Sequence, residues 1–197
     1  MTVTTIAILL AYIVVAASGK FSCTGTHTES SFNSIIVPQG ETCTLEKFNE
    51  VSGDITVQQG ASLIICPDND IAGNIKAKGA DTVFISDQKI PPCALPPPPK
   101  ALGITIGGSV KVKNANSFSL IGNPAGVTSI GKDVKVKDTQ DVNIIDFDGI
   151  AGNVKAEKNG DVTITGNTIG KNLKIKGTTG SCVDADNSVG GKIKGCP

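Results

Sequence analysis

The chain has 197 residues, and its 18 basic and 18 acidic side chains leave no net charge at neutral pH. Bulk electrostatic attraction to nucleic acid or to an anionic membrane is therefore excluded as a basis for function. The chain contains no arginine and few aromatic residues, and both are typical of nucleic-acid binding surfaces, so we expect no nucleic-acid partner. The length suits one domain with a sizeable core.

The first residues have the pattern of a secretory signal. An apolar run of 12 residues from Ile6 to Ala17 leads into the small residues Ala16 to Gly19, which predicts a signal peptide over residues 1–19. The run is too short to cross a bilayer as a helix, although a buried core helix is an alternative. We therefore expect a secreted, extracellular protein with no transmembrane segment after cleavage.

Residues 20–34 are rich in Ser and Thr and predict a flexible lead-in. The rest of the chain, residues 35–197, is organised by a repeated five-residue opening: an aliphatic residue, a small residue, usually Gly or Lys, a short polar residue and another aliphatic residue. It recurs seven times at intervals of 20, 35, 24, 20, 19 and 20 residues. The openings are VSGDI at Val51, IAGNI at Ile71, IGGSV at Ile106, IGKDV at Ile130, IAGNV at Ile150, IGKNL at Ile169 and VGGKI at Val189.

Within each repeat, apolar residues recur at positions 0, 4, 6, 12 and 14 counted from the opening. In one repeat these are Ile150, Val154, Ala156, Val162 and Ile164. Pairs separated by two residues indicate short strands with alternate side chains inward. Stacking such repeats about 4.8 Å apart makes one continuous core. The sequence therefore predicts an all-β, right-handed parallel β-helix of about seven coils of ~20 residues, with a β-sandwich as the alternative.

One coil carries a long insertion at residues 86–105, which includes four consecutive prolines, Pro96 to Pro99. Such a segment favours the polyproline II conformation and cannot join a strand ladder. We expect it to form a loop outside the β-helix.

Six cysteines follow the predicted signal peptide, and an even number in a secreted chain favours disulfides. Zinc is disfavoured because there is no CxxC pair and His27 is the only histidine, so we expect no metal and no cofactor. Cys66 lies at the corner from which the loop carrying Cys93 leaves, and pairing of Cys23 with Cys43 and of Cys182 with Cys196 would close the two ends. Spacing alone leaves 15 connectivities open.

Three segments resemble a group of secreted β-helix proteins, mostly uncharacterised bacterial sequences, with repeated VxGNVxV and IGGNLxC motifs and a carboxy-terminal cysteine. They are GETCTLEKFNEVSGDITVQQGASLII at residues 40–65, IGGSVKV at 106–112, and TGNTIGKNLKIKGTTGSC with NSVGGKIKGC at 165–196. The resemblance covers most of residues 35–196 and implies a pectin-lyase-like fold. The chain departs from the motif where Lys174 and Ile175 follow IGKNL in place of cysteine. This group has no assigned activity, so the resemblance implies none in particular for this chain.

The residues of known β-helix enzymes are missing. A resemblance to pectate lyases would imply an arginine base, and one to polygalacturonases a Gly-His-Gly segment; neither occurs. Acidic and amide residues do gather at the corner that varies between repeats, where they favour turns but are also candidates for calcium ligands or catalytic carboxylates. They are Asp68, Asp70, Asn123, Asp146, Asp148, Asn167, Asp184, Asp186 and Asn187. We expect no enzymatic activity, with a carbohydrate-active enzyme that uses these aspartates as the alternative.

Lysine is concentrated at positions 5 and 7 of the repeat, which face outward on the first strand. These lysines are Lys76, Lys78, Lys111, Lys113, Lys135, Lys137, Lys155, Lys174 and Lys176, with Lys194 in the last coil. Stacking would place them in two columns, and successive lysines in a column would lie about 5 Å apart. The arrangement favours either solubility or salt-sensitive binding of a polyanion such as acidic polysaccharide. We expect an extracellular structural or binding module that uses this surface, or alternatively a protein-binding factor that uses the Pro-rich loop.

Overall fold

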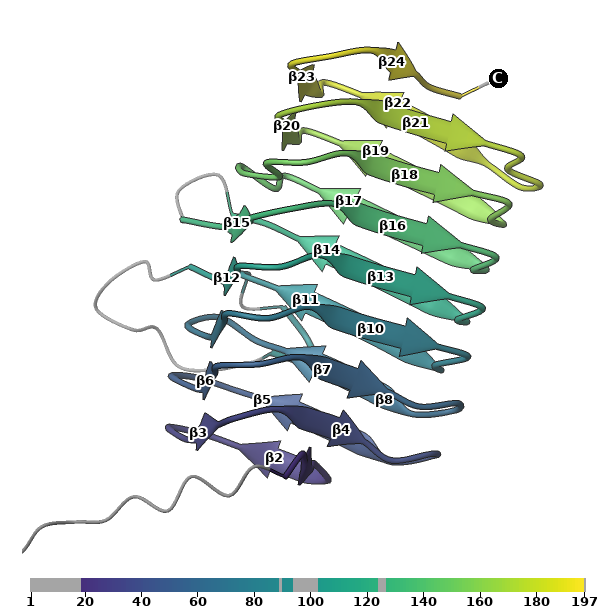
Figure 1. The fold of residues 1–197 in the computed structure, drawn as a ribbon. Helices are drawn as coiled ribbons and strands as arrows, with labels where there is room; N and C mark the ends of the chain where they lie inside the picture. The colour runs from purple at the N-terminus through teal and green to yellow at the C-terminus, as the bar shows by residue number, and fades with distance from the viewer. Residues whose placement is uncertain (1–18, 89, 94–102, 124–126, 197) are drawn as a thin grey trace, which may run out of the picture.

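The computed structural model describes residues 19–88, 90–93, 103–123 and 127–196. Within these residues the chain forms 24 β-strands and no helix, and every strand pairing is parallel. The protein is a parallel β-solenoid of about eight turns (Figure 1). The predicted fold class is confirmed. The predicted signal peptide falls outside the described residues except for Gly19, and so do Pro96 to Pro99.

Three sheets run the length of the solenoid, with one strand per turn except in sheet C, where the turn that contains Ile150 contributes only a bridge. Sheet A contains β1 (Phe21–Ser22), β4 (Ile35–Val37), β7 (Ile55–Val57), β10 (Ile75–Lys78), β13 (Val110–Lys113), β16 (Val134–Lys137), β18 (Val154–Glu157), β21 (Leu173–Lys176) and β24 (Ile193–Lys194). Sheet B contains β2 (Gly25–His27), β5 (Thr42–Leu45), β8 (Ser62–Ile65), β11 (Thr82–Ser86), β14 (Ser117–Ile121), β17 (Asp141–Ile145), β19 (Asp161–Thr165) and β22 (Cys182–Ala185). Sheet C contains β3 (Ser31–Phe32), β6 (Glu50–Val51), β9 (Asp70–Ile71), β12 (Thr105–Ile106) and β15 (Ser129–Ile130), and single bridges through Ile150 continue it to β20 (Thr168–Ile169) and β23 (Ser188–Val189).

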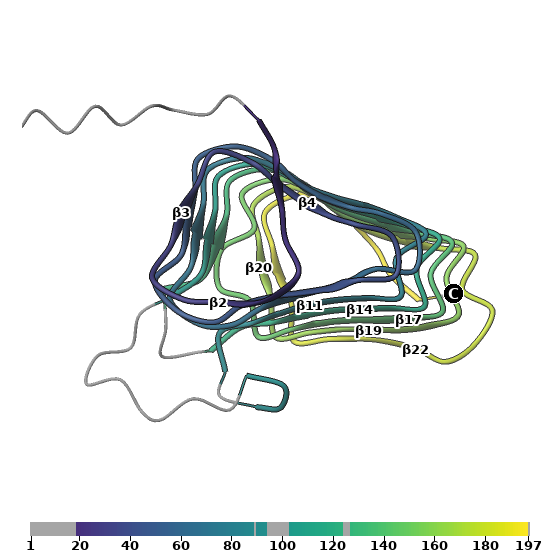
Figure 2. The same ribbon diagram turned by 90° about the horizontal axis from the view of Figure 1, so that it is seen from below.

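The cross-section is three-sided, and the hand of the coil is visible from the N-terminal end (Figure 2). In that view the chain passes clockwise from β2 through β3 to β4 while it recedes from the viewer. The solenoid is therefore right-handed, as the repeat length predicts.

Alternation of residue types along each strand builds the core. In β16, Val134 and Val136 are buried while Lys135 is exposed. The same alternation repeats at each level, and the inward residues form a single cluster that runs through the molecule. All of the predicted inward positions of the Ile150 repeat, for example, are at most 1% exposed.

The predicted flexible lead-in over residues 20–34 is wrong. Strands β1, β2 and β3 in this segment pair with β4, β5 and β6 and form the first turn, so the solenoid has about eight turns rather than about seven. Cys23 is fully buried and Phe32 packs against the core. The serines and threonines of this segment belong to the outer surface and turns, and the few apolar residues among them are sufficient to close the end.

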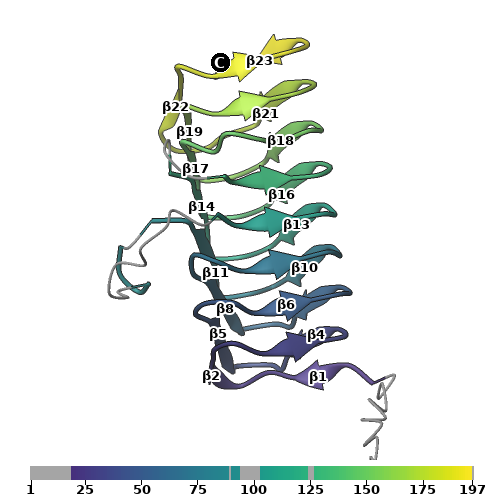
Figure 3. The same cartoon turned by 90° about the vertical axis from the view of Figure 1, so that its left-hand side faces the viewer.

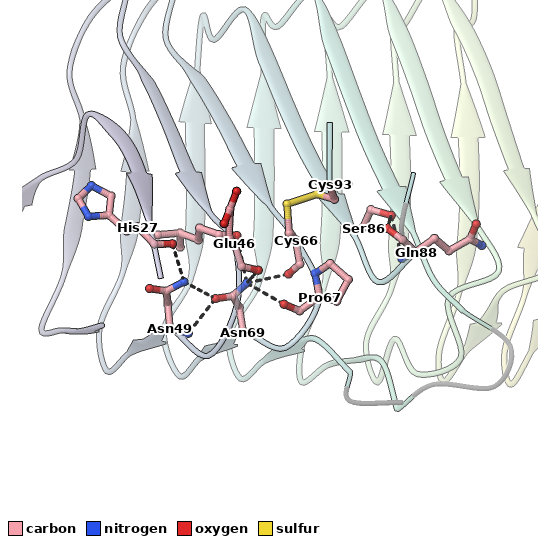
Figure 4. The surroundings of a disulfide bond; sticks show 10 residues. His27, Glu46, Asn49, Cys66, Pro67, Asn69, Ser86, Gln88 and Cys93 are labelled. Carbon is pink, nitrogen blue, oxygen red and sulfur yellow. Dashed lines mark hydrogen bonds between the residues drawn. A yellow bond between two sulfur atoms is a disulfide. The ribbon is translucent and has the colours of Figure 1, made fainter. Parts of the chain in front are cut away.

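Polar side chains hold the turns together at buried corners. The Asn69 amide group, 2% exposed, donates to the backbone carbonyls of Leu45, Glu46 and Cys66, and its Oδ1 accepts from Asn49 of the turn before (Figure 4). Asn167 and Asn187 form an equivalent step near the C-terminal end. The carbonyl of Leu45 also accepts from the backbone amide of Cys66, so the Asn69 amide matters most for the carbonyls of Glu46 and Cys66.

All six cysteines are paired, which confirms the disulfide prediction. The bonds join Cys23 to Cys43 in the first two turns, Cys66 to Cys93 at the base of the inserted loop (Figure 4), and Cys182 to Cys196 in the last turn. Three disulfides are typical of a protein from an oxidising environment.

Candidate binding surface

The lysines predicted to line one face do so, on the outer surface of sheet A. Strand register places them in two columns that run parallel to the solenoid axis. The first column is Lys76, Lys111, Lys135, Lys155, Lys174 and Lys194, and the second is Lys78, Lys113, Lys137, Glu157 and Lys176. Side by side on parallel strands, like charges repel one another.

Three carboxylates that lie within 3.2 Å of a lysine ammonium group offset part of this repulsion. Asp54 pairs with Lys76, Asp133 pairs with Lys135 at 2.8 Å, and Glu157 lies 3.1 Å from Lys155 and 3.2 Å from Lys174. Asp54 and Asp133 occupy position 3 of their repeats, on the same outward side as position 5. Their pairing was not predicted: the two-residue spacing indicates the pair of Asp133 with Lys135, whereas Asp54 pairs with Lys76 of the next repeat.

The pKa values of these carboxyl groups are lowered by the same contacts. Hydrogen bonding from Lys76, followed by the backbone amide of Asn74, lowers the pKa of Asp54 to about 2. The backbone amide of Asn153, followed by Lys135, holds the pKa of Asp133 well below its ordinary value. Lys155 and then Lys174 lower the pKa of Glu157. All three groups are therefore anionic at neutral pH.

The middle of the surface is not neutralised in this way. Within the described part of the chain, Lys78, Lys111 and Lys113 have no carboxylate within 4.0 Å of the ammonium group. These three residues are exposed. With Lys76, Lys135 and Lys137 they line a shallow hollow of about 410 Å³ over β10, β13 and β16. We call Lys78, Lys111 and Lys113 the unpaired lysine group.

Most of the aspartates and asparagines of the variable corner lie in turns, whereas Asp70 is in β9 and Asp184 is in β22. Asp68, Asp146 and Asp186 have φ angles of 68°, 52° and 55°, in the left-handed region that Asp tolerates in turns. The side chain of Asp184 accepts a hydrogen bond from the backbone amide of Cys196. No group of three or more His, Cys, Asp or Glu residues in the described ranges is arranged to hold a metal ion.

One acidic residue that sequence inspection missed is buried at the same corner. Asp87 is 4% exposed, and neither of its carboxylate oxygens has a hydrogen-bond partner. Burial, and secondarily the charge of Asp68, raises the pKa of Asp87 to about 7. Alternation along β11 is the signal that could have found it, because Asp87 follows the inward residues Val83 and Ile85 at the same two-residue spacing.

Across the described residues, no helix is long and apolar enough to span a membrane. A scan against protein-family models, a search of curated proteins and a search of solved structures each find no match to this chain. The parallel β-solenoid predicted from the repeats and from the resemblance is confirmed, whereas the particular group of VxGNVxV proteins remains a prediction.

Proposed function

We propose that the protein is a secreted, non-catalytic binding module that holds an acidic polysaccharide against the outer face of sheet A. The unpaired lysine group carries this proposal. Lys78 lies on β10, and Lys111 and Lys113 lie on the adjacent strand β13, about 4.8 Å away along the solenoid axis. An extended polyanion that follows the columns meets several of them at once, and each contact relieves repulsion that the folded protein otherwise retains.

A lysine surface suits a chain of separated negative charges. The ammonium group is a point charge on a long, flexible stem, so it adapts to carboxylates or sulfates at varied positions without the fixed geometry that arginine requires. The hollow over β10, β13 and β16 is shallow, so a polymer that approaches the outer face of sheet A can reach these ammonium groups. We extend the proposal to membership of the secreted VxGNVxV β-helix proteins, on the motifs at residues 40–65 and 165–196.

The test is binding of the protein to matched acidic and neutral polysaccharides, with release of reducing ends followed in the same samples. We expect binding to polygalacturonate and to sulfated dextran but not to neutral dextran. Affinity should fall as ionic strength rises, because screening acts on exposed charges. Equal affinity for neutral chains, or release of sugar products, would contradict the proposal; release of products would support a carbohydrate-active enzyme instead.

A further inference from the structure

The two ends of the solenoid expose apolar residues that every intermediate turn buries. One inward column of sheet A begins at Phe21 and ends at Ile193. Its seven intermediate members are at most 1% exposed, whereas Phe21 is 38% and Ile193 is 57% exposed. The intermediate members are Ile35, Ile55, Ile75, Val110, Val134, Val154 and Leu173.

Sheet C repeats the pattern. Its inward column runs from Phe32 to Val189, and both of these terminal residues are only partly buried. At the N-terminal end, Phe21, His27 and Phe32 pack ring against ring, with centroids 4.7 to 5.6 Å apart, and form an aromatic plate over the core. At the C-terminal end, Val189 and Ile193 stand at the corresponding positions of the last described turn.

Strand edges are also open at both ends. Within the described residues β1 and β3 pair on one side only, and so do β23 and β24 (Figure 3). An edge strand of this kind is a template for pairing with another chain. Because all strands are parallel, a second copy stacked in the same orientation would continue sheets A and C with the same polarity.

Charge favours one orientation of the two copies. Residues 20–50 hold two lysines and four glutamates, a balance of −2, whereas residues 171–196 hold five lysines and two aspartates, a balance of +3. A head-to-tail contact joins these opposite charges, while a tail-to-tail contact would bring two basic ends together. On sheet B the inward position of β22 is Asp184 rather than an apolar residue, so the contact depends on sheets A and C.

We propose that copies of this protein associate head to tail, with Ile193 and Val189 of one copy packed on Phe21 and Phe32 of the next. Such a contact is heterologous and does not close on itself, so it generates linear assemblies rather than a single dimer. The apolar residues of this contact point inward, so the contact does not require the outer face of sheet A to bind a polysaccharide, although Lys174, Lys176 and Lys194 of that face contribute to the charge of the C-terminal end.

The test uses the full chain, produced in an oxidising secretory compartment, with sedimentation measured over a concentration series. We expect the average mass to grow with concentration, and to grow less in ~0.15 M than in ~0.01 M salt because the charges are screened. Ile193→Asp and Phe21→Asp should each abolish growth when present alone. Mixed in equal amounts they should form a dimer and nothing longer, since each variant keeps one intact end.

Val127→Asp is the matched control, because Val127 is an apolar residue that is 73% exposed and lies away from both ends; it should associate like the unchanged protein. If Phe21→Asp does not fold, Ile193→Asp still tests the proposal, because small amounts of it should shorten assemblies of the unchanged chain. A protein that is monomeric at all concentrations, or a mixture of variants that stays monomeric, overturns the head-to-tail contact. Self-association of Ile193→Asp alone does so too.

Discussion

Lysines in the same column of sheet A differ in the charges beside them. Asp54 and Asp133 lie beside Lys76 and Lys135, on either side of the unpaired lysine group along the solenoid axis, and Glu157 lies beside Lys155 and Lys174 farther along the columns. An exposed ion pair of this kind contributes little to stability. It nevertheless changes the local potential, because a carboxylate repels the same polyanion that the neighbouring ammonium group attracts.

Replacement of Glu157 tests this effect directly. Glu157→Gln removes the negative charge that lies within 3.2 Å of both Lys155 and Lys174. We expect tighter binding of polygalacturonate, by roughly threefold to tenfold, if one charge near the surface contributes about 1 kcal/mol. Titration calorimetry gives the dissociation constants, with Glu29→Gln as the control because Glu29 pairs with Lys47 away from sheet A. Unchanged or weaker binding by Glu157→Gln would contradict this account of the surface.

Asp87 predicts an unusual dependence of stability on pH. Its pKa is 3.8 in the ordinary case and about 7 when folded, so the folded protein binds more protons than the unfolded chain between these values. The free energy of unfolding therefore falls as pH rises through this window, by at most about 4 kcal/mol. The carboxyl groups with lowered pKa values change the free energy of unfolding only below about pH 5, at the acid end of this window. We expect denaturant unfolding to show lower stability at pH 8 than at pH 5.

Asp87→Asn should remove most of this difference, because the amide cannot ionise, and should raise stability at pH 8. Asp148→Asn is the matched control, since Asp148 is exposed at the same corner; it should retain the pH dependence. Equal stability of the unchanged protein at pH 5 and pH 8 would show that Asp87 is not buried in this way.

At the scale of the single turn, the structure depends on contacts between side chains and the backbone of the neighbouring turn. Strands of two to five residues bury too little apolar surface to be stable alone. Buried asparagines such as Asn69 fix the spacing at the corners, where the chain changes direction and carbonyls such as those of Glu46 and Cys66 accept from the side-chain amide. The buried amides at the corners therefore help to determine the fold, as the columns of apolar residues do.

Asn69→Ala should lower the free energy of unfolding by about 2–4 kcal/mol, because several buried carbonyls lose their donor together. Asn172→Ala serves as the control: Asn172 lies in a comparable step between turns, but on the exposed side. Its loss should cost about 1 kcal/mol or less. Chemical denaturation measures both, and a loss for Asn69→Ala no larger than that of the control would contradict the proposed role of the buried amide.

The disulfides should act locally, since each has a sequence separation of at most 27 residues and joins parts of one turn, two neighbouring turns, or a turn and the inserted loop. Loss of Cys182–Cys196, through serine at both positions, should raise hydrogen exchange in β22 and β24, which have turns on one side only. Loss of Cys66–Cys93 should leave exchange in β10 and β13 unchanged, because that bond anchors a loop outside the strand ladders. Hydrogen exchange measured by mass spectrometry distinguishes the effects of the two variants. A uniform increase over the whole chain in either variant would argue that the turns unfold as one unit.

On the scale of the whole molecule, the repeat period was enough to predict the fold, the hand of the coil and the two lysine columns. Periodicity fixes which residues share a face, so Lys111 and Lys135 could be placed together without coordinates. It did not reveal the first turn, because only Phe21, Cys23 and Phe32 carry the apolar pattern there. Nor did it distinguish paired from unpaired lysines, since an ion pair depends on side-chain conformation as well as on strand register.

The central claim is that the unpaired lysine group binds an acidic chain. The most direct measurement compares the affinity of polygalacturonate for Lys111→Ser/Lys113→Ser and for Lys47→Ser/Lys158→Ser, which change the net charge equally. At about 1 kcal/mol per lysine, we expect about thirtyfold weaker binding for the first pair and a much smaller change for the second. Equal losses would assign binding to net charge alone, and no loss in either variant would leave these lysines a role in solubility only.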